Sequence, residues 1–189
     1  GGLGGGSTNA AGLILYLNKI LNWNYSTLKL IKLGLQFGAD VPFCLVGGTA
    51  CVRGIGEKIT PVKFESSYTY LLIFPKISVS TQTIFQAFDK SLTSTKKPTK
   101  TPKSFLNFKL GTNDLKAITF GLYPELQNIE QIILQYHQQL YMSGSGSTCF
   151  VPFKNQIDAE AFRRQIKSYF IADQLLIVQE VQEGCRVDV

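Results

Sequence analysis

Apolar residues recur at steps of three and four positions between residues 10 and 21, which predicts a helix with one buried face. The predicted face consists of Ala10, Leu13, Ile14, Leu17, Ile20 and Leu21. Ser7 precedes this helix and is expected to be its N-cap, because a serine side chain can accept a hydrogen bond from the first turn. The segment GGLGGG (1–6) is expected to form a loop, since glycine destabilises regular elements.

A second helical pattern follows at once. The helix is expected to begin after Ser26, to bury Leu28, Ile31 and Leu35, and to stop at Gly38. These two helices form the first part of the predicted fold.

Two later stretches have the texture of β-strands. Between residues 43 and 62, the runs FCLVGG, TACVRG and KITPV are rich in β-forming residues and are separated by glycines. The apolar segment YTYLLIFP (68–75) predicts a buried strand, which Pro75 ends because proline cannot donate to a sheet.

The rest of the chain alternates between helical and strand patterns. TQTIFQAF (81–88), NDLKAI (113–118) and PELQNIEQIILQYH (124–137) are expected to be helical. The apolar face of the third consists of Leu126, Ile129, Ile133 and Tyr136. LYM and TCFVPF predict two strands on either side of a glycine–serine segment, which we call the Gly–Ser loop (residues 143–148). A helix over 157–170, with Ala159, Phe162, Ile166 and Phe170 apolar, and a strand over 175–181 complete the pattern.

This mixture of helices and strands indicates an α+β fold. The polar stretch KFESS (63–67) is the expected boundary between two domains, one over 1–65 and one over 66–189.

Composition narrows the class of protein. Hydrophobic residues make up 44% of the 189 residues and charged residues 17%, which is typical of a globular protein. No apolar run reaches the length that a membrane helix requires, so no membrane partner is expected. The net charge of +6 owes much to KKPTKTPK (96–103), which we expect to be a solvated loop and not a nucleic-acid contact, because it has no aromatic residue for stacking on bases.

The cysteines and the histidine give no metal signature. Cys44, Cys51, Cys149 and Cys185 lack the close pairing that zinc sites use, and the chain has only one histidine. Free thiols in a reducing cytoplasm are therefore expected, and metal ligands cannot be assigned.

The first candidate site is GGLGGGSTNAA (1–11). A helix N-terminus offers unpaired backbone N–H groups and a partial positive charge, and glycines in front of it let the backbone approach phosphate oxygens. Ser7 and Thr8 add hydroxyl groups that could donate to phosphate or ligate magnesium. The segment lacks the Gly-Lys-Ser/Thr of a Walker loop and the GxGxxG of a dinucleotide site. A flexible glycine linker before a helix is the alternative interpretation.

Two further segments could carry chemistry. In GADVPFCLVGGTACVRGIGE (38–57), Asp40 lies just beyond a predicted helix end, where its carboxylate could accept a hydroxyl proton during phosphoryl transfer. Asp40 could equally be a turn former. In MSGSGSTCF (142–150), the Gly–Ser loop could approach a phosphate or another substrate group with its backbone, or could be only a tight hairpin loop.

Taken in this order, the three segments resemble the motifs of the GHMP small-molecule kinases. They look most like the branch that uses ATP to phosphorylate the 2-hydroxyl of a cytidine-diphosphate-linked methylerythritol, and SVSTQTIFQ (78–86) and Asn113-Asp114 also match that branch. The resemblance implies an N-terminal domain similar to domain 2 of ribosomal protein S5, here incomplete, followed by a ferredoxin-like C-terminal domain. It implies ATP with Mg²⁺ as cofactors, the cytidine compound as substrate, and a cytoplasmic or plastid enzyme.

The resemblance also assigns roles to residues of this chain. By position, Asp40 matches the catalytic base, which also contacts substrate. The residues that match the ATP phosphate loop are Gly2, Leu3, Gly4, Gly5, Gly6, Ser7 and Thr8. The residues that match the substrate site are Thr81, Phe85, Gly144, Ser145 and Gly146.

In this family a further segment, which carries a lysine, a Tyr-His pair and several strands, precedes the phosphate loop. The 189 residues do not include that segment, so we expect the chain made alone to be inactive and to pair with a second copy or be partly unfolded. Two other functions stay open: another GHMP kinase of the homoserine or mevalonate type, and a non-catalytic binding module on the same fold.

Overall fold

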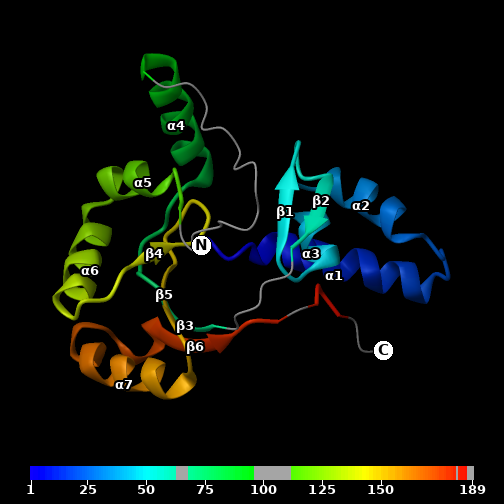
Figure 1. Ribbon diagram of the computed structural model, residues 1–189. Helices are drawn as coiled ribbons and strands as arrows, with labels where there is room; N and C mark the ends of the chain where they lie inside the picture. Colours follow the sequence, from blue (N-terminus) through cyan, green and yellow to red (C-terminus); the bar gives the residue numbers. More distant parts are fainter. Residues whose placement is uncertain (63–67, 96–111, 182, 187–189) are drawn as a thin grey trace. The chain divides into compact units, whose positions relative to one another are not determined.

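The computed structural model describes residues 1–62, 68–95, 112–181 and 183–186 (Figure 1). They form two compact units, which we call the sheet unit (Gly1–Leu3 with Ser67–Gln179) and the hairpin unit (Gly4–Ser66 with Glu180–Val189). The sequence predicted two continuous domains, 1–65 and 66–189. In the structure each unit consists of two segments, because the sheet unit includes residues 1–3 and the hairpin unit includes the residues from 180 onward. KFESS and KKPTKTPK lie outside the described residues.

The sheet unit has a four-stranded antiparallel sheet with the order β4-β5-β3-β6. Its strands are β3 (Thr69–Ile73), β4 (Tyr141–Met142), β5 (Cys149–Phe153) and β6 (Leu175–Gln179). Between β3 and β4 come α4 (Thr81–Thr95), α5 (Lys116–Leu122) and α6 (Pro124–Gln135). Between β5 and β6 come α7 (Gln156–Ile166) and the 3₁₀ turns η2 (Lys167–Tyr169) and η3 (Ala172–Gln174). This order is ferredoxin-like, as expected.

The core of the sheet unit lies on one face of this sheet. In β3 and β5, buried residues alternate with half-buried ones, as period-two side-chain direction requires. Helices α5, α6 and α7 contribute Phe120, Leu126, Ile133, Phe162 and Ile166 to the same core. The apolar faces predicted for α6 and α7 are therefore confirmed.

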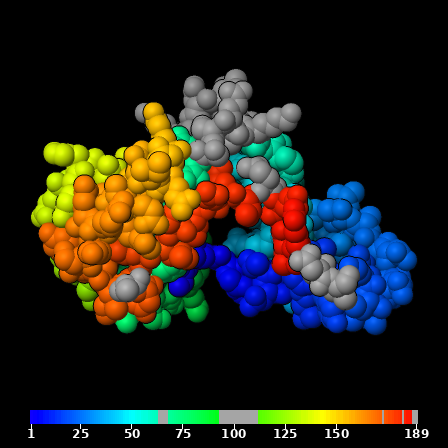
Figure 2. All heavy atoms as spheres, turned by 90° about the horizontal axis from the view of Figure 1, so that it is seen from below, coloured from blue at the N-terminus to red at the C-terminus, as the bar shows by residue number. Residues whose placement is uncertain are grey.

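The carboxyl end of α6 lies near α7 (Figure 1), and the two elements are neighbours in yellow-green and orange on the face shown in Figure 2. The ring of Tyr136, at the end of α6, packs edge-on against Phe162 of α7, with 5.9 Å between the ring centroids. Among the described residues, no helix combines the length and apolar character needed to cross a bilayer.

The hairpin unit consists of three helices that pack on one another and a two-stranded antiparallel hairpin. The elements are α1 (Gly5–Ile20), α2 (Thr27–Leu35), α3 (Val41–Val46), β1 (Ala50–Arg53) and β2 (Lys58–Pro61). Ala11, Ile14, Leu30 and Val41 form its buried core. Both units thus combine helices and strands, and the expected α+β class is confirmed.

The buried faces of α1 and α2 differ from the predicted ones. Leu13 is 57% exposed and Leu28 is 72% exposed, whereas Leu30 and Gly34 are buried. A Cβ atom at Gly34 would lie 3.0 Å from side-chain atoms of both Val41 and Leu45. The close approach of α3 at a glycine thus fixes which side of α2 is buried, and counting apolar residues could not reveal it.

The run FCLVGG was expected to be a strand, and this prediction was wrong. It falls largely in α3, where Pro42 occupies the first turn and therefore costs no helix hydrogen bond. Gly47, with a φ of 74°, ends the helix in a conformation that favours glycine. The other two runs form β1 and β2 as predicted.

Ile133 and Leu134 give a matched test of the sheet-unit core, because they are neighbours in α6 with opposite environments. Ile133 is fully buried and Leu134 is 54% exposed. We expect Ile133→Ala to lower the free energy of unfolding by about 2–5 kcal/mol through lost burial and a cavity. Leu134→Ala should change it by less than about 0.5 kcal/mol. Urea unfolding followed by far-UV circular dichroism measures both, and equal losses would contradict the assigned face.

Cys149 should be the unreactive thiol of the chain. Burial in β5 raises the pKa of the Cys149 thiol to about 12, so it stays protonated at pH 8, where the thiolate is the reactive form. The other three cysteines are free and half-buried. A short pulse of N-ethylmaleimide at pH 8, read by peptide mass spectrometry, should label Cys149 only after unfolding in urea. Rapid labelling of Cys149 in the native protein would contradict its placement.

Candidate functional site

The glycine-rich segment at the start of the hairpin unit opens directly into α1. The helix begins at Gly5, and Gly4 is its N-cap with a left-handed φ of 62°. The predictions that Ser7 caps the helix and that residues 1–6 form a loop were therefore wrong. The reason is that Gly4 reaches the left-handed conformation without strain, so the helix can begin before the serine.

The first turn of α1 is open. Thr8 N–H donates to Gly4 O (2.8 Å), so the three preceding amides of the helix have no acceptor within it. Cβ atoms built at Gly4, Gly5 or Gly6 would meet nothing within 4 Å, and the first turn has no acidic residue. This end of α1 therefore presents unpaired donors and a partial positive charge to open space.

Asp40 lies in the same unit, at the N-cap of α3. Its side chain is exposed and makes no cap hydrogen bond. The Oγ1 of Thr8 lies 3.7 Å from the Sγ of Cys44, which is one helical turn beyond Asp40. The first turn of α1 is therefore in contact with α3, the helix that carries Asp40 at its N-cap. The point of contact lies one helical turn, a rise of about 5.4 Å, beyond Asp40.

The β1–β2 turn braces the segment just before Asp40. Gly56 has a φ of 114°, and a Cβ atom there would lie 2.0 Å from the carbonyl oxygen of Ala39. Glu57 closes the same turn. Hydrogen bonds from its own N–H and from Ile55 N–H (2.8 Å) hold the pKa of the Glu57 carboxyl below its usual value. The motif GIGE thus shapes the backbone next to Asp40.

In the sheet unit, the Gly–Ser loop lies beside the first residues of the chain. Ser143 Oγ donates to Gly2 O (2.6 Å), and Thr148 Oγ1 donates to Gly1 O (2.5 Å). A Cβ atom at Gly2 would lie 2.7 Å from the carbonyl oxygen of Ser143. The predicted phosphate-loop residues are thus divided, with Gly2 and Leu3 in the sheet unit and Gly4 to Thr8 in the hairpin unit.

The sheet unit brings the predicted substrate residues together. The hydroxyls of Thr81 and Ser145 lie 2.8 Å apart, which joins the start of α4 to the Gly–Ser loop. Phe85 follows Thr81 by one helical turn and is 49% exposed. Gly144 and Gly146 have φ angles of 55° and 86°, which favour glycine.

Asn113 is the residue that motif reasoning left without a role. Its Nδ2 donates to Met142 O (2.9 Å) and to Gly144 O (2.8 Å). Because these partners are about thirty positions away in the sequence, only the match of Asn113-Asp114 to known kinases pointed to it.

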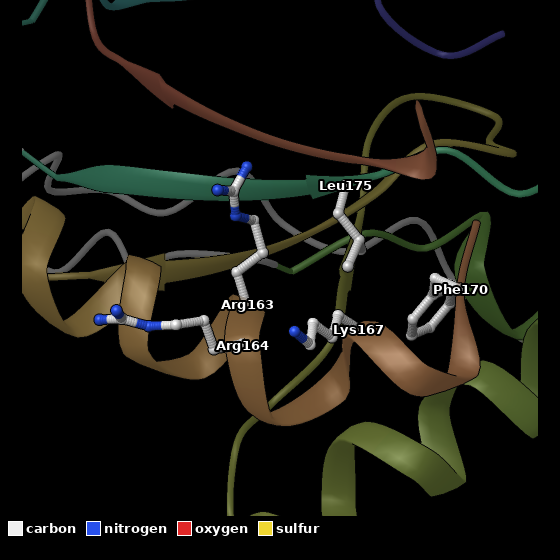
Figure 3. Close-up of a pocket in the computed structure, with 5 residues that line it drawn as sticks. All are labelled: Arg163, Arg164, Lys167, Phe170 and Leu175. Carbon is white, nitrogen blue, oxygen red and sulfur yellow. The ribbon is translucent and has the colours of Figure 1, made fainter. Parts of the chain in front are cut away.

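A basic hollow on α7 lies elsewhere in the sheet unit. Its volume is about 300 Å³, and it is lined by Arg163, Arg164, Lys167, Phe170 and Leu175. In Figure 3, Arg163 reaches from α7 toward the sheet and Leu175 reaches from β6 toward the helix. None of the predicted site residues lines it. The cations lie near the carboxyl end of α7, where positive charge is favourable for the helix.

No group of three or more His, Cys, Asp or Glu side chains that could hold a metal ion occurs in the described part of the chain.

Two family models and several known proteins match this chain. Residues 1–48 match the model of the GHMP kinases N terminal domain, and residues 105–172 match that of the GHMP kinases C terminal domain. The chain is 40% identical over 169 residues to a 4-diphosphocytidyl-2-C-methyl-D-erythritol kinase of Caldicellulosiruptor saccharolyticus, with 84% of this chain covered. It is 34% identical over 195 residues to the enzyme of the same name of Alkaliphilus oremlandii, with 98% of this chain covered.

Solved structures show the same fold. A crystal structure of 4-(cytidine 5'-diphospho)-2C-methyl-D-erythritol kinase superposes with a TM-score of 0.72 and 26% identity, covering 94% of this chain and 65% of that one. A homoserine kinase from Cytophaga hutchinsonii superposes with a TM-score of 0.63 at 16% identity, covering 97% of this chain and 67% of that one, which shows the fold alone.

The chain spans 57% and 66% of the lengths of the two bacterial relatives. The two family models together match more than half of the residues of this chain. They describe the N-terminal and C-terminal domains of the GHMP kinases. The chain belongs to the GHMP kinase family.

Proposed function

We propose that this protein transfers the γ-phosphoryl group of ATP to the 2-hydroxyl of a cytidine-diphosphate-linked methylerythritol. The observation that carries the proposal is the contact of Thr8 with Cys44, because it joins an open, glycine-rich helix end to the helix capped by Asp40. The substrate is supported by the names of the two relatives, which are both 4-diphosphocytidyl-2-C-methyl-D-erythritol kinases.

The hairpin unit would bind ATP. The unpaired amides of the first turn of α1 would donate to phosphate oxygens, with Gly4 to Gly6 leaving room for them. Gly2 and Leu3 would complete the loop. The Ser7 hydroxyl suits phosphate or a cation, whereas the Thr8 hydroxyl donates to Gly4 O (3.1 Å) and would offer only an oxygen lone pair to a cation. When bound with ATP, Mg²⁺ would supply neutralisation of the phosphate charge.

Asp40 would act as the base. Its carboxylate would take the proton of the substrate hydroxyl as the hydroxyl oxygen forms a bond to the γ-phosphorus. The bond from that phosphorus to the bridging oxygen breaks, and ADP leaves with the bond's electron pair. An exposed carboxylate without a cap hydrogen bond is available for this role.

The sheet unit would bind the substrate. Phe85 exposes an aromatic ring on which the cytosine could stack, and Thr81 lies one turn before it on the same face of α4. Gly144, Ser145 and Gly146 would contact the polar part of the molecule with their backbone.

The choice among GHMP substrates has a direct test. In the complete gene product that contains this sequence, product is assayed by mass spectrometry with ATP and, in turn, the cytidine compound, homoserine and mevalonate. Phosphorylation of only the cytidine compound is expected. Phosphorylation of homoserine or mevalonate instead would contradict the proposed substrate.

Replacing Asp40 separates catalysis from binding. In the complete gene product, Asp40→Asn should lower kcat by about 10²–10⁴-fold, because the amide cannot accept the proton. ATP affinity, measured by isothermal titration on the same variant, should stay within about twofold, since the phosphates are held by α1. An unchanged kcat would indicate that Asp40 is not the base, and a lack of turnover in both proteins would favour a binding module.

Removing the ring of Phe85 tests the cytidine site. Phe85→Ala should weaken binding of cytidine 5′-diphosphate about tenfold through lost stacking, with ATP affinity unchanged. Leu92→Ala is the matched control, because Leu92 is also exposed and lies two turns further along α4. Equal effects of the two variants would show that Phe85 has no specific contact with the base.

A further inference from the structure

The side chain of Asn113 holds the Gly–Ser loop from outside. One amide group makes three hydrogen bonds: its Nδ2 donates to Met142 O (2.9 Å) and Gly144 O (2.8 Å), and its Oδ1 accepts from Leu115 N–H (3.0 Å). Both donor positions of the amide and one acceptor position are therefore used. The third bond lies at the start of α5, so Asn113 links that helix to the loop.

The bond to Gly144 O also fixes the direction of a neighbouring amide. A trans peptide unit is planar, and its C=O and N–H point to opposite sides. Because Asn113 fixes the carbonyl of Gly144, the N–H of Ser145 in the same peptide unit must point away from Asn113. In the described parts of the chain, neither this N–H nor that of Gly144 donates to a protein acceptor.

The carbonyl groups of the loop have the opposite character, because most of them accept hydrogen bonds inside the protein. Ser143 O accepts from Gly146 N–H (2.9 Å), Ser145 O from Thr119 Oγ1 (3.3 Å), and Thr148 O from Ser143 N–H (3.0 Å). Asn113 also holds the carbonyl groups of Met142 and Gly144, so protein donors engage most of the partial negative charges of the loop. The N–H groups of Gly144 and Ser145, like those of Ser147 and Thr148, donate to no acceptor in the described parts of the chain. A backbone with unpaired N–H groups attracts anions.

We propose that Asn113 is a positioning residue that orients the Gly–Ser loop so that the N–H of Ser145 donates to an anionic oxygen of the substrate. The identity of that substrate rests on the proposed function. The orientation of the loop by Asn113 does not depend on it. Asn113 acts through the loop and touches neither substrate nor ATP in this role.

The chemistry of the side chain explains why the position requires asparagine. Aspartate has the same shape and could still accept from Leu115 N–H, but an ionised carboxylate has no donor and would repel the two loop carbonyls. Asn113→Asp therefore keeps the bond at α5 and removes only the hold on the loop. Asn113→Ala removes all three bonds. Asp114→Asn is the matched control, because Asp114 is the exposed neighbour and has no hydrogen bond to the loop.

The test follows backbone amides by ¹H–¹⁵N NMR in the complete gene product that contains this sequence. In Asn113→Asp, hydrogen exchange of the two hydrogen-bonded loop amides, those of Ser143 and Gly146, should rise about tenfold or more, while amides of α5 and α6 keep their protection. Cytidine 5′-diphosphate should shift the Ser145 amide of the parent chain, and Asn113→Asp should weaken this binding about tenfold. Asp114→Asn should change neither property. If Asn113→Asp fails to fold, Asn113→Ala is read in the same way.

Unchanged loop exchange in both Asn113 variants would overturn the proposal, as would binding of cytidine 5′-diphosphate that leaves the Ser145 amide unmoved. If the parent chain does not bind this nucleotide, the proposed substrate fails, and inorganic pyrophosphate is titrated in its place. A pyrophosphate-induced shift at Ser145 that Asn113→Asp abolishes supports the positioning role, and its absence overturns it.

Discussion

The sheet unit depends on the hydrogen bonds that its buried polar Gly–Ser loop makes with other segments. Ser145, Ser147 and Thr148 are at most 7% exposed, and a buried hydroxyl or carbonyl without a partner would destabilise the fold. Their partners come from segments that are far apart in the sequence, including Gly1, Ile77 and Thr81. No buried side-chain polar atom of the described residues lacks a partner. The loop therefore joins the start of the chain, α4 and α5 into one arrangement.

In the hairpin unit, the first turn of α1 is open to solvent while the rest of the helix is packed against its neighbours. The glycines at the start of α1 remove side chains from the region in front of the first turn. Behind it, Ala11 and Ile14 are buried against Leu30 and Val41, so the helix itself is anchored by apolar packing. An accessible row of donors on a rigid helix is what preorganised binding of an anion requires.

The local pattern of the sequence determined most of the elements. Apolar runs located β3, β5 and β6, and helical spacing located α6 and α7, because each of these elements has a buried face. The same reasoning was wrong for α3 and for the face of α2. In those places the close approach at Gly34 and the helix-compatible Pro42 decided the outcome, and neither produces a periodic signal.

The sequence by itself also determined which kinds of residue the candidate site contains: a glycine-rich helix start, one carboxylate at a helix junction and a glycine–serine loop. Only the tertiary structure decided that Thr8 contacts Cys44, that Ser145 contacts Thr81, and that Asn113 holds the loop. The physical reason is that hydrogen bonds between segments dozens of residues apart depend on how the chain packs. Short-range spacing records only how each segment meets its own neighbours.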